Sequence, residues 1–67
     1  MTDQLERDAR MLLATRGFED CWYLDNEVRR ILSALATAGT LAEEEVEWHT
    51  REGRLAALEG WVRRRGS

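Results

Sequence analysis

The stretch CWYLDNEVRRILSALATAG, residues 21–39, carries the clearest structural signal in this 67-residue chain. Apolar residues recur along it at alternating spacings of three and four, which is the period of one face of an α-helix. These residues are Cys21, Leu24, Val28, Ile31, Leu35 and Ala38, and Leu32 widens the face. Gly39 ends the pattern, because glycine readily adopts the left-handed conformation that stops a helix. We therefore predict a helix over residues 20–38, with its apolar face packed as in a coiled coil.

A shorter helix is predicted ahead of this one. Asp3 followed by Glu6 matches the capping box that starts helices, and Gly17 provides a stop. The predicted helix covers residues 3–16. Its apolar face is the weakest of the three predicted helices, and consists of Leu5, Ala9, Leu12 and Leu13.

A third helix is predicted over residues 41–65. Thr40 followed by Glu43 repeats the capping pattern, and the chain contains no proline to interrupt the helix. A break at Gly53 is the alternative. The short connection at Gly39 and Thr40 predicts that the second and third helices are antiparallel neighbours. The predicted fold class is all-α: a helical hairpin of these two helices, with the shorter N-terminal helix packed across it.

The predicted third helix carries apolar residues on two sides. The broader side is expected to face the second helix, and contains Leu41, Trp48, Leu55, Leu58 and Val62. The narrower side consists mostly of small residues: Ala42, Val46, Gly53, Ala57, Gly60 and Trp61. Its glycines suggest the close approach of another helix. The first helix is short, so we expect this side to meet a second copy of the chain in a symmetric homodimer. Coverage by the first helix or by a different protein is the alternative.

Composition bounds the remaining possibilities. A chain of 67 residues allows one small domain, residues 1–67. The net charge is -3, and all ten basic residues are arginine, which excludes lysine-based chemistry. No apolar run approaches the roughly 20 residues that span a bilayer. The single cysteine, Cys21, cannot form an internal disulfide, and this is consistent with the cytoplasmic location that we predict.

No arrangement of residues points to catalysis. Nucleophilic catalysis needs a nucleophile, a base and an orienting group, and the chain has one histidine, His49, besides Cys21. Glu45 and His49 would lie one helical turn apart and form half of a metal site, but nothing in the sequence completes it. We therefore expect no enzyme activity, no catalytic residue, no cofactor and no bound metal.

Protein binding is the function that the sequence favours. We expect a small regulator, inhibitor or assembly factor that binds itself and another protein; in size and charge it is like the small proteins with which phages and mobile elements take over a host. The expected protein-binding residues are Val46, Gly53, Ala57, Gly60, Trp61, Trp22 and Tyr23. The alternative is a DNA-binding or transcription-accessory protein that uses the arginines at 63–65. It is disfavoured because Glu43, Glu44 and Glu45 would repel phosphate at the start of a recognition helix.

Overall fold

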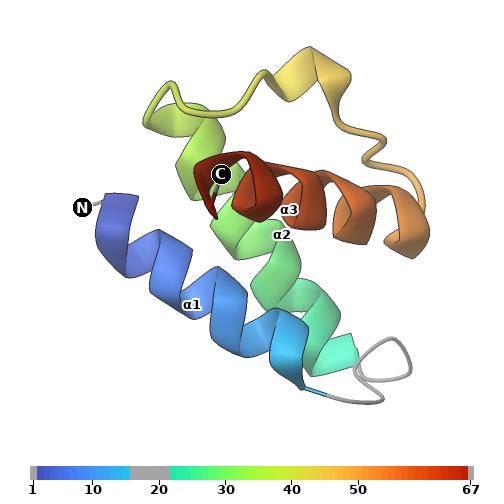
Figure 1. Cartoon of the computed structure of the whole chain (residues 1–67). Helices are drawn as coiled ribbons and strands as arrows, with labels where there is room; N and C mark the ends of the chain where they lie inside the picture. The colour runs from blue at the N-terminus through green and yellow to red at the C-terminus, as the bar shows by residue number, and fades with distance from the viewer. Residues whose placement is uncertain (1, 16–21, 67) are drawn as a thin grey trace.

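The computed structural model describes residues 2–15 and 22–66, without the side chains of Thr2, Trp22 and Tyr23 (Figure 1). This part of the chain is all-helical and contains no strand. Its α-helices are α1 (Thr2–Ala14), α2 (Trp22–Thr37) and α3 (Arg51–Gly66), and a short 3-10 helix, η2 (Glu43–Glu45), lies between α2 and α3. The all-α prediction is confirmed. The predicted stop at Gly17 lies outside the described residues.

The end of α2 follows the prediction made from Gly39. Gly39 has a φ of +79°, and its N–H donates to the Ala36 carbonyl at 3.1 Å. The N–H of Thr40 donates to the Leu35 carbonyl at 3.1 Å. Together these bonds form a Schellman motif, which satisfies the last carbonyls of the helix. The Thr40 hydroxyl also donates to the Leu35 carbonyl, at 3.2 Å, so this side chain completes α2.

The predicted third helix over 41–65 is wrong in its first ten residues. In the structure η2 is flanked by extended residues, and α3 begins only at Arg51. The hydroxyl of the preceding residue, Thr50, accepts a hydrogen bond from the Gly53 N–H at 2.9 Å. Thr50 therefore occupies the N-cap position. Thr40 is already bonded to α2, and a helix over 41–50 would place Glu43 and Glu47 one turn apart, where like charges repel.

This change also removes the basis for a tight hairpin. The link between α2 and α3 spans residues 38–50, where the prediction required a turn at Gly39 and Thr40 alone. Figure 1 shows this link arching past the end of α2, and α3 then lying across α2. α1 packs against both of the other helices, so the three helices share one core.

The core consists of apolar side chains from all three described α-helices and from the link. Its buried members are Ala9, Leu12, Val28, Ile31, Leu32, Leu35, Val46, Leu58 and Trp61. The four α2 residues in this set belong to the predicted apolar face, which is thereby confirmed. At the ends of that face, Leu24 is partly buried and Ala38 is exposed, while Cys21 lies outside the described residues. Leu41, Trp48, Leu55 and Val62 are partly buried against the core.

The two glycines of the narrow side of α3 have different surroundings. A Cβ added at Gly53 would lie 2.5 Å from Cβ, Cγ and the carbonyl oxygen of Glu47. The close approach at Gly53 is therefore with the link of the same chain. A Cβ at Gly60 would meet only the end of the Arg64 side chain, at 3.6 Å, so nothing packs tightly there.

Alanine substitutions should separate these glycines. Gly53→Ala should lower the free energy of unfolding by about 1–3 kcal/mol, because the Glu47 backbone must move. Gly60→Ala should raise it by about 0.5–1 kcal/mol, since alanine favours helix interiors. Urea titrations followed by circular dichroism at 222 nm would measure both changes. Stabilisation by Gly53→Ala would show that the contact with Glu47 is not tight.

Candidate functional site

The five protein-binding residues predicted on α3 and the link are buried or half-buried. Val46 is 8% exposed and Trp61 is 2% exposed, in the same core as Ala9 and Leu12 of α1. Ala57 and Gly60 are half-buried. Val46 and Trp61 are therefore buried within a single copy of the chain. For these two residues, the alternative prediction that the first helix covers them agrees with the structure better than the predicted homodimer contact does. The side chains of Trp22 and Tyr23 lie outside the described part of the structure.

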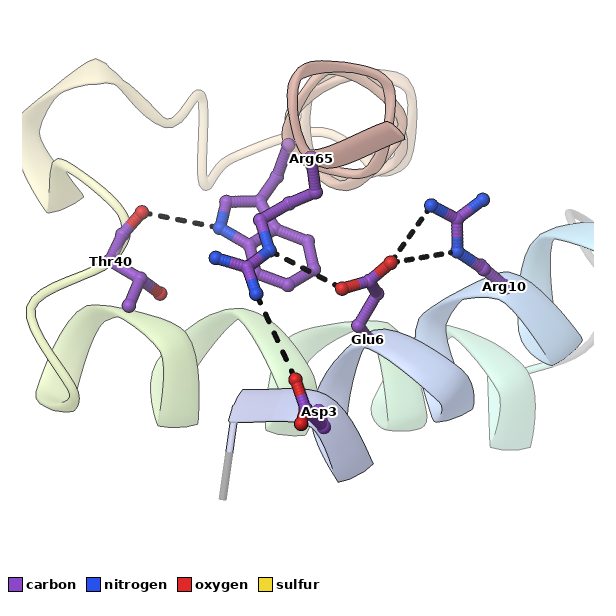
Figure 2. Close-up of polar contacts among 6 residues, drawn as sticks. Asp3, Glu6, Arg10, Thr40 and Arg65 are labelled. Carbon is purple, nitrogen blue, oxygen red and sulfur yellow. Dashed lines mark hydrogen bonds and ion pairs between the residues drawn. The ribbon is translucent and has the colours of Figure 1, made fainter. Parts of the chain in front are cut away.

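Trp61 belongs to a polar network at the C-terminal end of α3. Figure 2 labels the other members of this network, which are Asp3, Glu6, Arg10, Thr40 and Arg65. The Trp61 indole N–H donates to the Thr40 carbonyl at 3.2 Å. The Arg65 guanidinium lies 5.3 Å from the centre of the indole ring, in a cation–π arrangement. Arg65 Nε also donates to Glu6 Oε1 at 3.3 Å, and Nη2 lies 4.0 Å from Asp3 Oδ1. One of the three C-terminal arginines is thus neutralised by acids of α1, which weakens the case for a nucleic-acid-binding tip.

Glu6 is the charged centre of this network. Arg10 donates to Glu6 Oε2 from Nη2 at 2.8 Å and from Nε at 3.0 Å. The hydrogen bond from Arg10 is the largest cause of a lowered pKa at Glu6, and the one from Arg65 adds to it. Partial removal of the carboxyl group from water acts in the opposite direction. The charged form of Glu6 is therefore favoured in the folded protein.

This lowered pKa predicts how stability depends on pH. A carboxyl group whose pKa is depressed by folding stabilises the protein above its unfolded pKa, about 4.3 for glutamate. That contribution is lost as the pH falls through the folded pKa. Glu6→Gln should therefore flatten the fall in stability below about pH 4.3, as measured by thermal unfolding at a series of pH values. An unchanged slope in Glu6→Gln would contradict this assignment.

A buried ion pair joins the N-terminal ends of α2 and α3. Arg54 is 4% exposed, and its Nη2 and Nε donate to the two carboxylate oxygens of Asp25 at 2.9 and 3.2 Å. Its Nη1 donates to the carbonyl oxygen of Trp48, which fixes the link to the same point. Arg54 is charged, and charged residues are mostly exposed at the surface of a protein. No local pattern indicates its burial, because Asp25 lies 29 positions away.

A groove between α1 and α2 is the first of two surface hollows of interest. Its volume is about 300 Å³. Its lining residues are Asp8, Met11, Leu12, Thr15, Glu27, Arg30 and Ile31. Met11 is 68% exposed, which is unusual for a large apolar side chain in this structure. Met11 is not among the binding residues expected from the sequence, although it directly precedes Leu12 and Leu13 of the apolar face of α1.

The second hollow lies where the link passes the C-terminal half of α2. Its volume is about 380 Å³, and its lining residues are Ser33, Ala36, Thr37, Glu43 and Trp48. Trp48 is half-buried, and its indole N–H donates to the Glu43 carbonyl at 3.1 Å. The indole is therefore held against η2 while it forms part of the hollow.

Neither hollow holds a recognisable catalytic arrangement. Across residues 2–15 and 22–66, no three His, Cys, Asp or Glu side chains are grouped so that they could hold a metal ion. Glu45 lies in η2 and His49 lies in the loop after it, so the two do not share a helical turn. In the same described ranges, no helix is long and apolar enough to cross a membrane.

Comparisons with protein-family models, with curated proteins and with solved structures found no match.

Proposed function

We propose that the protein is a non-enzymatic protein-binding module that acts as a small regulator, inhibitor or assembly factor. The observation that supports this function is the exposed Met11 beside the groove between α1 and α2. Methionine is flexible and polarisable, and is common at surfaces that bind other proteins. The binding surface that we now propose lies on α1 and α2, whereas the one predicted from the sequence lay mainly on the third helix. The reason for the change is that Val46 and Trp61 are buried within the chain.

The chemistry of the groove suits an apolar side chain of a partner. Leu12 and Ile31 are buried core residues, and both reach the groove. Arg30 on α2 lies 3.8 Å from Asp8 on α1 and 2.9 Å from Glu27, so charged groups border the apolar part. An apolar centre with a polar rim is the usual composition of a protein interface. An amphipathic helix of a partner would match this groove, because its apolar face would contact the apolar centre and its polar residues would contact the charged border.

Self-association remains part of this proposal. A second copy of the chain would place Met11 against the partner's groove, and a two-fold axis lets one surface serve both copies. Such a homodimer would use α1 and α2, whereas the dimer predicted from sequence used Trp61. Light scattering of the pure protein would report the mass, and Met11→Glu would show whether this surface is responsible.

Affinity capture with matched variants tests the function. The bait is the full chain, and captured proteins are identified by mass spectrometry. Met11→Glu should release a bound partner, because it introduces a charge at the apolar centre, while Met11→Leu should retain the partner. Both variants should keep the circular dichroism spectrum of the native protein, since Met11 is exposed. Identical capture by Met11→Glu and the native protein, with no dimer in light scattering, would refute the proposal.

A further inference from the structure

We infer that the hollow beside Trp48 binds an arginine side chain presented by a basic segment of a partner protein. The hollow is lined by an aromatic residue, an acidic residue and two hydroxyl-bearing residues: Trp48, Glu43, Ser33 and Thr37. It lies on the C-terminal half of α2, apart from the groove at Met11, with which it shares no lining residue.

The aromatic wall is held in place before a ligand arrives. The indole N–H of Trp48 donates to the Glu43 carbonyl, and the Trp48 carbonyl accepts a hydrogen bond from Arg54. The residue is therefore fixed at its backbone and at its ring. A fixed ring loses little conformational entropy on binding, and tryptophan is the best aromatic partner for a cation.

The charge around the hollow favours a cation. Residues 43–47 carry four glutamates and no basic residue. Within the described chain, none of these carboxylates has an arginine as an ion-pair partner. Arg54, which reaches the Trp48 carbonyl, is neutralised by Asp25. The hollow also lies beside the last turn of α2, where the helix dipole is negative.

An arginine fits these groups better than other partners do. Its planar guanidinium stacks on an indole face and can bond to a carboxylate at the same time. Its remaining N–H groups match the hydroxyl oxygens of Ser33 and Thr37. An anionic ligand such as phosphate would be repelled by Glu43, the acidic residue that lines the hollow. A purely apolar side chain would make neither an ion pair nor a hydrogen bond with Glu43.

This inference deepens the proposed binding function, since it names the chemistry of one partner segment. The two can still fail separately. Binding at Trp48 is measured with a synthetic peptide and needs no natural partner, whereas the Met11 variants test capture of such a partner.

The experiment is an NMR titration of the labelled full chain with the peptide acetyl-Gly-Arg-Gly-Arg-Gly-amide. The indole N–H signal of Trp48, assigned by its loss in Trp48→Phe, should move in a saturable way. The same peptide with citrulline in place of arginine keeps the shape and removes the charge. It should bind roughly tenfold more weakly, because both the cation–π contact and the ion pair depend on that charge.

Matched variants locate the effect at the hollow. Glu43→Gln should weaken binding about fivefold, since only the carboxylate changes and the Glu43 carbonyl still holds the Trp48 indole. Glu59→Gln makes the same change of charge on the exposed side of α3 and should alter affinity less than about twofold. The inference is overturned if the Trp48 signal does not saturate, if citrulline binds as well as arginine, or if Glu43→Gln and Glu59→Gln weaken binding equally.

Discussion

Asp25→Ala should unfold most of the protein at room temperature. This change leaves the Arg54 guanidinium, 4% exposed, without its carboxylate. Breaking a buried ion pair by removal of one partner costs about 3–5 kcal/mol. A domain of this size rarely has more than about 3–5 kcal/mol of stability in total. Circular dichroism at 222 nm should therefore show a large loss of helix in the variant.

Two further variants identify the cause. Glu27→Ala removes an acid from the same helix, but its partner Arg30 has a side chain that is 52% exposed. Its cost should be about 0–1 kcal/mol, as for other surface pairs. The double variant Asp25→Leu with Arg54→Met replaces the ion pair by apolar groups and should recover most of the stability. A folded Asp25→Ala variant with near-native stability would contradict this account of the pair.

The course of α2 could be predicted from the sequence because two independent signals agree there. The apolar spacing from Leu24 to Leu35 predicts the buried face, and Gly39 adopts the left-handed conformation that the predicted stop required. Both signals are local, since each depends on residues within a few positions. Local sequence preferences of this kind predict the folded structure correctly when the tertiary contacts favour the same conformation.

The link could not be predicted because its capping signal has two possible readings. Thr40 can cap a following helix or complete the preceding one, and the structure shows the second. Thr50, the true cap, is followed at the third helical position by Gly53 instead of the glutamate of a capping box. Glycine at that position makes room for Glu47, and this contact is visible only in three dimensions.

The predicted binding residues were also affected by a contact that the local sequence does not show. A continuous helix over 41–65 would place Val46 and Trp61 on one exposed side. With the helix starting at Arg51, Val46 belongs to the link and both residues enter the core. The pairing of Arg54 with Asp25 depends on the same fold-back of the chain. Sequence periodicity describes a face only where the helix is continuous, and the link breaks that condition.

Trp61→Ala should destabilise the folded chain, and this is the second large effect that we expect. Trp61 is 2% exposed and donates its indole N–H to the Thr40 carbonyl. Truncation of a buried tryptophan costs about 3–5 kcal/mol, which matches the total stability of so small a domain. Trp61→Phe keeps most of the apolar volume and should cost roughly 1–2 kcal/mol through the lost hydrogen bond. Thermal unfolding measures both variants, and light scattering reports their mass. A Trp61→Ala variant that has the native melting temperature and differs only in its state of association would contradict this prediction. It would show that Trp61 binds a partner chain and that its burial within one copy does not stabilise the fold.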